Sequence, residues 1–207
     1  MDLMTRRRAM MQAWRASSGP LPSGFAEYAY IEATGTQYIN SGYVPTNDTE
    51  IHAITMRTAA QSWQKWDWGV IGGPKVLTAG SYWSWGSAND KQASNYNPDT
   101  PYGPFVVKVN KTGVYDSLGT LRGNFGTLTW TDGNLPIFLF CANYSGTADK
   151  FCKVRFYYWA AYENGTKMVE FIPALRRSDN ELGLYETVSG TFFTNAGSGV
   201  FTGAALA

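Results

Sequence analysis

Residues 83–99 combine two kinds of side chain that could bind a hydroxylated ligand such as a sugar. Trp83 and Trp85 alternate along one short segment, so they share one strand face. Exposed aromatic rings stack on sugar C–H surfaces, while amides and carboxylates exchange hydrogen bonds with hydroxyl groups. The polar candidates that follow are Asn89, Asp90, Asn95 and Tyr96. The alternative is that both tryptophans fill a core, since Trp is highly buried on average.

The residue patterns of several enzyme classes are missing from the sequence. Retaining glycoside hydrolysis needs two carboxylates held close together, but the acids are scattered and no Glu-x-Asp-x-x-Glu run occurs. A Gly-x-Ser-x-Gly elbow and a phosphate-binding loop are also missing. His52 is the one histidine, which excludes mechanisms that need two. We therefore expect a protein that is not an enzyme and that carries no cofactor.

The metal-ligating residues are equally sparse. Two cysteines, Cys141 and Cys152, cannot build a structural zinc site. The Asn and Asp residues between 89 and 99 lack the spacing of a calcium-binding loop. We expect no metal. A cross-strand disulfide between the cysteines is geometrically possible, but nothing indicates secretion, so free thiols are favoured.

The composition suits one large domain. The chain has 207 residues, and 17 Lys and Arg balance 16 Asp and Glu to a net charge of +1. This balance gives no electrostatic reason to bind nucleic acid. No run of 18 apolar residues predicts membrane insertion. Charged residues make up 16% and aromatic residues 15%, which excludes a disordered chain.

The N-terminal arm, residues 1–20, differs from the rest. Its first 16 residues are rich in the good helix formers Met, Ala, Arg and Leu, and Ser17 to Pro20 would end a helix. A secretory signal is excluded because no apolar core follows the arginines. A solvated terminus is one interpretation, and a helix that docks on a neighbouring subunit is the other, which we favour. The docking candidates are Leu3, Met4, Arg6, Arg7, Met10, Met11 and Trp14.

Residues 21–207 read as an all-β domain. Short aromatic or β-branched runs such as 105–110 and 135–142 alternate with Gly, Asn, Asp and Pro clusters. Asn164-Gly165 is a strong hairpin signal. A turn centred there pairs Tyr162 with Lys167, Ala160 with Val169 and Tyr158 with Phe171.

A second hairpin, centred on Gly146 and Thr147, would pair Cys141 with Cys152. Because side chains two apart share a face, one apolar face results. It collects Ile137, Leu139, Cys141, Cys152, Val154, Phe156, Tyr158, Ala160, Val169 and Phe171. The opposite, mixed face carries Phe138, Phe140, Lys153, Arg155, Tyr157 and Trp159. A meander with one apolar face must bury it against a second sheet, which predicts a β-sandwich.

Two stretches carry a resemblance to a known group. One is YIEATGTQYINSGY at residues 30–43, preceded by LPSG, and the other runs from FIPA at 171–174 through GLYE to FFTN and GSG. Over residues 21–203 the chain resembles the concanavalin A-like (laminin G-like) sandwich domains of bacteriophage and prophage structural proteins. The resemblance implies a jelly-roll of two antiparallel sheets, a fold that often binds carbohydrate.

Under this resemblance we expect a non-enzymatic virion or tail-associated protein, made in the bacterial host and built into a larger, oligomeric assembly. The arm would contact other virion proteins, and host surface polysaccharide is a second partner. The alternative is a stand-alone lectin; a glycoside hydrolase is disfavoured by the missing acids. Four Asn-x-Ser/Thr sequences, at Asn47, Asn110, Asn143 and Asn164, would be incidental in bacteria.

Overall fold

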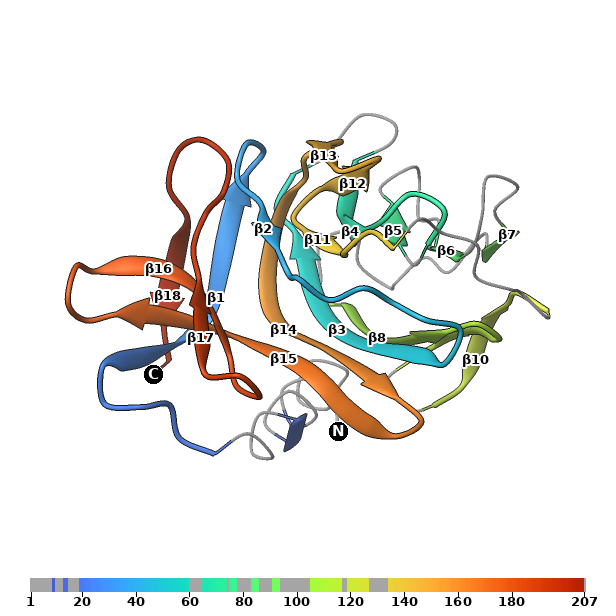
Figure 1. The fold of residues 1–207 in the computed structure, drawn as a ribbon, viewed down its shortest axis with the longest axis horizontal. Coiled ribbons are helices and arrows are strands. Elements are labelled where there is room, and N and C mark those ends of the chain that lie inside the picture. The colour runs from blue at the N-terminus through green and yellow to red at the C-terminus, as the bar shows by residue number, and fades with distance from the viewer. Residues whose placement is uncertain are drawn as a thin grey trace.

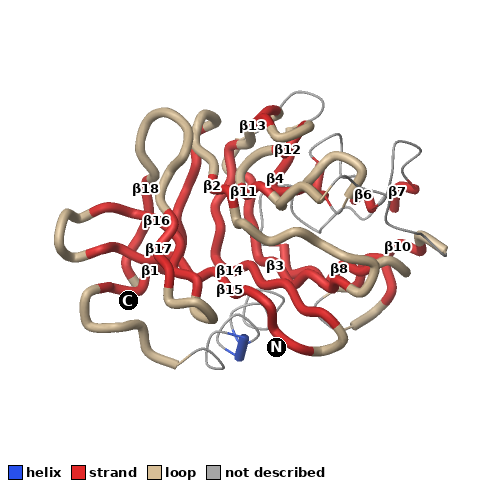
Figure 2. Tube along the Cα trace, viewed as in Figure 1, coloured by secondary structure: helices blue, strands red, loops and turns tan. Residues whose placement is uncertain are grey.

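In the computed structural model, the regular secondary structure of the described residues consists almost entirely of antiparallel β-strands (Figures 1 and 2). The residues that the structure describes are 9, 13–14, 19–59, 65–73, 75–77, 83–85, 91–93, 105–116, 119–126 and 134–206. Within these ranges no helix is long and apolar enough to cross a membrane. The described strands form two large sheets and one small hairpin.

The larger sheet contains ten of the described strands, in the order β10-β9-β8-β3-β14-β1-β15-β16-β17, with β18 beside β1. Its strands are β1 (Phe25–Thr34), β3 (Thr49–Arg57), β8 (Phe105–Asn110), β9 (Gly113–Tyr115), β10 (Leu121–Asn124), β14 (Lys153–Glu163), β15 (Thr166–Arg176), β16 (Glu181–Glu186), β17 (Thr191–Phe193) and β18 (Thr202–Ala205). The strand predicted at 105–110 is confirmed.

The second sheet contains six of the described strands, in the order β2-β11-β4-β5-β6-β7. They are β2 (Ile39–Asn40), β11 (Phe138–Leu139), β4 (Trp66–Gly69), β5 (Lys75–Leu77), β6 (Trp83–Trp85) and β7 (Lys91–Ala93). A separate hairpin pairs β12 (Ala142–Tyr144) with β13 (Thr147–Asp149).

The two large sheets share one apolar core. Trp68 and Leu139 of the six-stranded sheet belong to the same buried cluster as Trp159 and Phe171 of the ten-stranded sheet. The rings of Trp68 and Trp159 meet edge to face, with centroids 6.1 Å apart. The predicted all-β, sandwich-like class is therefore confirmed.

The hairpin of β14 and β15 has the predicted turn but only part of the predicted register. Asn164 and Gly165 have φ of 48° and 80°, which suits a two-residue turn that follows the strand twist. Tyr162 faces Lys167 as predicted. Beyond that pair, a β-bulge leaves Met168 without a partner across the hairpin. The predicted pairs of Ala160 with Val169 and Tyr158 with Phe171 are therefore wrong.

A second bulge on β14 moves side chains to the other face of the sheet. Along the pairing with β3, Phe156 faces Thr55 and Tyr158 faces Ile54, so Tyr157 is skipped. Since one inserted residue reverses the alternation, Trp159 enters the main core, whereas the prediction put it on the mixed face. Tyr158 and Ala160 instead lie with Ile54 in a separate buried cluster.

The predicted strand over 135–142 is interrupted at Phe140. This residue has φ of 71°, which an L-residue rarely adopts. Its backbone N–H donates to the Asp67 carbonyl, and its carbonyl accepts from the Cys152 N–H. The ring is fully buried against Phe156 and Phe201, so its predicted place on a wet face is also wrong.

The two cysteines do not pair across the small hairpin. Its turn lies at Ser145 and Gly146, one residue earlier than predicted, and Ala142 faces Asp149. Cys141 and Cys152 are both buried, and neither forms a disulfide. Burial raises the pKa of the Cys141 thiol well above its usual range, so this thiol stays protonated.

The two stretches that carry the resemblance, residues 30–43 and 171–199, lie against each other. The Thr36 carbonyl accepts from the Ser198 N–H, and the Tyr38 carbonyl accepts from the Ala196 N–H. A Cβ on Gly197 would collide with the Thr36 carbonyl oxygen, so the close approach requires glycine.

Candidate functional site

A polar groove of about 370 Å³ forms where three connecting segments meet. These are the residues leading into β3, the turn between β8 and β9, and the turn between β14 and β15. The lining residues are Asn47, Asp48, Thr49, Glu50, Asn110, Lys111, Thr112, Asn164 and Gly165. Because β3 lies between β8 and β14 in the sheet, these segments gather although they are far apart in the chain.

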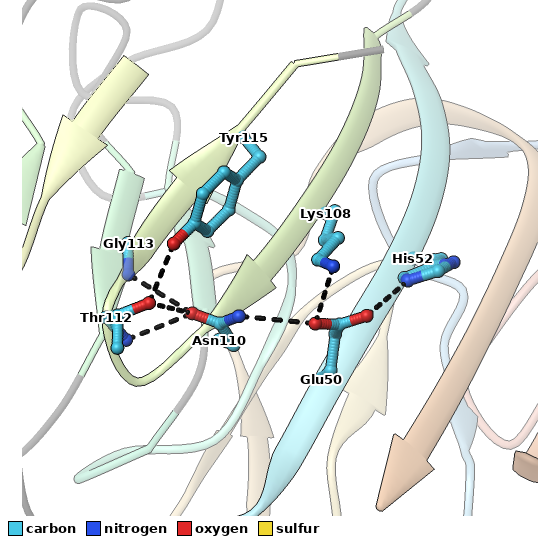
Figure 3. Close-up of polar contacts among 7 residues, drawn as sticks. All are labelled: Glu50, His52, Lys108, Asn110, Thr112, Gly113 and Tyr115. Atoms are coloured by element: carbon cyan, nitrogen blue, oxygen red, sulfur yellow. Dashed lines mark hydrogen bonds and ion pairs between the residues drawn. The ribbon is translucent and has the colours of Figure 1, made fainter. Parts of the chain in front are cut away.

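The turn between β8 and β9 is shaped by one amide side chain. The Asn110 Oδ1 accepts hydrogen bonds from the backbone N–H groups of Thr112 and Gly113, at 3.0 and 3.3 Å. It also accepts one from the Thr112 hydroxyl at 2.6 Å. This is the usual way in which Asn fixes a turn. The Asn110 NH₂ group is left to point toward Glu50 (Figure 3).

Glu50 is the centre of the polar network on the groove wall (Figure 3). Its Oε1 contacts the His52 Nε2 at 2.8 Å. Its Oε2 accepts from the Asn110 Nδ2 at 3.2 Å and contacts the Lys108 Nζ at 2.9 Å. Both carboxylate oxygens are thus engaged, and the carboxylate is fixed in direction.

These contacts change the acidity of Glu50. Burial by itself raises the pKa of the carboxyl group, but the hydrogen bonds from His52, Lys108 and Asn110 outweigh it and lower the pKa from 4.5 to about 2. Glu50 is therefore ionised at neutral pH. A carboxylate held in this form accepts hydrogen bonds and does not act as a general acid.

The Glu50→Gln variant tests this network through the stability of the fold. The folded-state pKa lies below the unfolded value, so the carboxylate stabilises the fold above pH 4.5, and the stabilisation is lost as the pH falls toward 2. We expect the free energy of unfolding to fall by about 1–2 kcal/mol at pH 7, with a smaller difference from the wild type at pH 3. Urea unfolding of the variant and the wild type at pH 7 and at pH 3 measures this difference.

Asp48→Asn is the matched control for that measurement. Asp48 makes an ion pair with Lys111 at 3.2 Å, and both side chains are exposed. Exposed pairs contribute less than about 1 kcal/mol, so the control should unfold nearly as the wild type does. An equal loss in both variants, or a Glu50→Gln loss that does not shrink at pH 3, would contradict the assignment.

Hydrogen bonds of Thr46 and Thr49 hold the segment that leads into β3 in place. The Tyr43 hydroxyl lies 2.7 Å from the Thr49 hydroxyl and donates to the Glu163 carboxylate at 2.9 Å. Burial raises the pKa of Tyr43 above its usual range, although the hydrogen bond with Thr49 opposes this. The Thr46 hydroxyl also donates to Glu163. The groove therefore has a preformed wall.

The arrangement suits recognition of a neutral, hydroxylated ligand. Amide groups of Asn47 and Asn164 supply donors and acceptors, and the carboxylates of Asp48 and Glu50 supply acceptors. The Asn110 amide holds the turn and Glu50 in place. Both carboxylates already have lysine partners, so the lining carries little unbalanced charge. Within the described ranges, no three His, Cys, Asp or Glu side chains gather as metal ligands would.

A second cavity, of about 440 Å³, lies at another part of the molecule. Its lining includes Asp179, Glu181, Leu182, Asn195 and Val200. Arg176 makes ion pairs with both of the carboxylates, at 2.7 and 2.9 Å.

The predicted aromatic site is placed only in part. Trp83 and Trp85 lie on β6, facing Ala93 and Lys91 of β7, and this hairpin forms one edge of the six-stranded sheet. The structure describes their backbone but not their side chains. The remaining candidates, Asn89, Asp90, Asn95 and Tyr96, lie outside the described residues. This site stays a prediction.

The structure describes only part of the predicted docking arm. Ala9, Ala13 and Trp14 have helical backbone, while Leu3, Met4, Arg6, Arg7, Met10 and Met11 lie outside the described residues. The Trp14 ring stacks on His52 of the same chain, with centroids 4.9 Å apart. The helix over the whole arm, and its contact with a neighbouring subunit, stay predictions.

The polar groove was not predicted, although a signal for it is present. Three of the four Asn-x-Ser/Thr sequences, at Asn47, Asn110 and Asn164, line the groove. Asn143 is fully buried and donates to the Pro136 carbonyl. Because Asn and Thr favour turns, these sequences indicate turns, and the strand order brings three of them together.

No family model, no curated protein and no solved structure matches this chain.

Proposed function

We propose that this chain is a non-enzymatic, virion- or tail-associated structural protein of a phage that displays a lectin-like β-sandwich, and that the polar groove binds host surface glycans. The observation that carries the glycan part is the groove lining. Amide and carboxylate side chains converge on about 370 Å³, which lies within the size range of small-molecule sites.

The virion setting rests on the resemblance of residues 21–203 to phage structural domains. Its two signature stretches are joined through backbone hydrogen bonds of Thr36 and Tyr38. This contact explains why both stretches would be needed for one fold. A concanavalin A-like jelly-roll is the finer form of the sandwich that we propose on this basis.

A stand-alone lectin is the second candidate, and one contact favours it. Trp14 packs on the chain's own sheet, so this residue of the arm is already engaged without a neighbour. In the virion proposal the arm contacts other virion proteins. It does so either while Trp14 stays packed on His52 and Tyr158 or after Trp14 has left them.

The test is a calorimetric titration of the full chain with bacterial surface polysaccharides and with a panel of defined glycans. We expect saturable binding that Asn47→Ala weakens by about tenfold, since one lost hydrogen bond contributes about 1.4 kcal/mol. Asn110→Ala should also weaken binding, because Glu50 and the turn at Thr112 lose their hydrogen bonds to Asn110. Tyr144→Ala, an exposed position on β12, is the control and should leave the affinity unchanged.

Two results would contradict this proposal. Binding that is lost in Trp83→Ala or Trp85→Ala but kept in Asn47→Ala and Asn110→Ala would move the site to the β6–β7 hairpin. No binding across the panel by a cooperatively folded chain would remove the glycan role and leave a structural role alone.

A further inference from the structure

The outer face of the ten-stranded sheet carries a second buried cluster, away from the main core. Ile54, Tyr158 and Ala160 are each at most 1% exposed, and Trp14 packs against them. The Trp14 ring lies 5.5 Å from the Tyr158 ring. A residue from the N-terminal arm thus covers part of β3 and β14.

His52 lies between this cluster and the polar groove. One side of its ring stacks on Trp14 at 4.9 Å with an interplanar angle of 29°, and it also contacts the Tyr162 ring at 4.6 Å. Its Nε2 lies 2.8 Å from the Glu50 Oε1. The ring is therefore held by aromatic contacts while its edge reaches the groove wall.

The contacts continue without interruption into the groove lining. The other oxygen of Glu50 accepts from the Asn110 NH₂ group at 3.2 Å, and Asn110 fixes the turn at Thr112 (Figure 3). Glu50, Asn110 and Thr112 all line the groove. Four successive contacts thus join Trp14 to a residue that would touch the ligand.

We infer that Trp14 is a positioning residue of the groove: by stacking on His52, the arm holds Glu50 and Asn110 in the arrangement that receives a ligand. This inference rests on the proposed function in taking the ligand to be a glycan. It adds that docking of the arm and occupancy of the groove are coupled. A partner that displaces Trp14 from His52 would therefore weaken ligand binding in the groove.

The expected effect is partial because Glu50 keeps other partners. Lys108 still contacts its Oε2 at 2.9 Å when His52 is free to turn. Loss of Trp14 removes the stacking partner on one side of the imidazole, so the ring gains freedom and the Glu50 carboxylate loses a fixed donor. Couplings of this kind change affinity by about fivefold or more.

The experiment compares Trp14→Ala with Trp14→Phe in the full chain. Two signals are followed by NMR: the His52 ring and the Asn110 side-chain NH₂ group. We expect Trp14→Ala to shift both signals and to weaken binding of the best glycan on the panel about fivefold. Trp14→Phe keeps an aromatic ring and should restore both. Tyr144→Ala is the control and should move neither.

The outcomes separate this inference from the proposed function. If the wild type binds no glycan, the proposed function fails, but a shift of the Asn110 NH₂ signal in Trp14→Ala still supports the positioning role. If that signal stays unchanged, or if affinity and signals shift equally in Trp14→Phe and Trp14→Ala, the inference is overturned. If Trp14→Ala unfolds, Trp14→Phe decides: wild-type signals support the role, and alanine-like shifts overturn it.

Discussion

Replacing Arg57 with methionine is expected to lower the free energy of unfolding by about 3–5 kcal/mol, because it leaves a carboxylate buried between the two sheets. Asp67 of β4 is 1% exposed, and its Oδ1 lies 3.2 Å from the Nε of Arg57 on β3. The Thr55 hydroxyl and the Cys152 thiol also donate to Asp67. Chemical unfolding of the purified variant measures the loss.

The double variant Arg57→Met/Asp67→Leu is the control for this prediction. Replacing both members of a buried ion pair with apolar residues is often neutral or stabilising, so most of the lost stability should return. A double variant as unstable as the sum of both single variants would show that the two side chains act independently. A loss below about 1 kcal/mol in Arg57→Met would contradict the buried pairing.

Replacing Trp159 with alanine is expected to have an effect of similar size, about 3–5 kcal/mol. Trp159 is fully buried, and its ring contacts Tyr43, Trp68 and Phe171, with centroids 5.9–6.4 Å apart. It therefore fills the space where the two sheets meet. Thermal and urea unfolding, compared with the exposed control Tyr144→Ala, measure the loss.

A phenylalanine at the same position should recover much of that stability. The Trp159 Nε1 is buried and has no hydrogen-bond partner among the described residues, so Trp159→Phe breaks no hydrogen bond there and removes an unsatisfied donor. Trp159→Phe as unstable as Trp159→Ala would mean that the Nε1 group has a partner. If Trp159→Ala is as stable as the wild type, Trp159 lies on the solvent-exposed face that the sequence pattern predicts and not in the core.

On β14 and β15, the difference between the predicted and the observed core comes from two inserted residues. The turn at Asn164-Gly165 and the first pair, Tyr162 with Lys167, follow from local turn chemistry. Met168 and Tyr157 then each reverse the alternation. Neither is a glycine, and nothing in the surrounding residues marks a bulge. Only packing against β3 and the facing sheet selects which side of β14 is buried.

The polar groove lies beyond sequence reasoning for a different reason. Asn47, Asn110 and Asn164 each predict a turn by themselves. What brings the turns together is the order β8-β3-β14 in the sheet, and that order depends on long-range pairing that no local pattern records. In contrast, the all-β class follows from composition and periodicity alone, because both average over many residues.

The position of β1 has a consequence for how the chain folds during synthesis. β1 pairs with β14, β15 and β18, and the C-terminal strand lies beside it (Figure 1). At ribosomal rates of about 5–20 residues per second, β1 therefore leaves the ribosome on the order of ten seconds before the first of its partners. Throughout that time it is an unpaired, aromatic-rich edge, exposed to aggregation and to chaperones. The ten-stranded sheet is complete only after β18 has been synthesised and has paired with β1, so this domain cannot finish folding before Ala205 has left the ribosome.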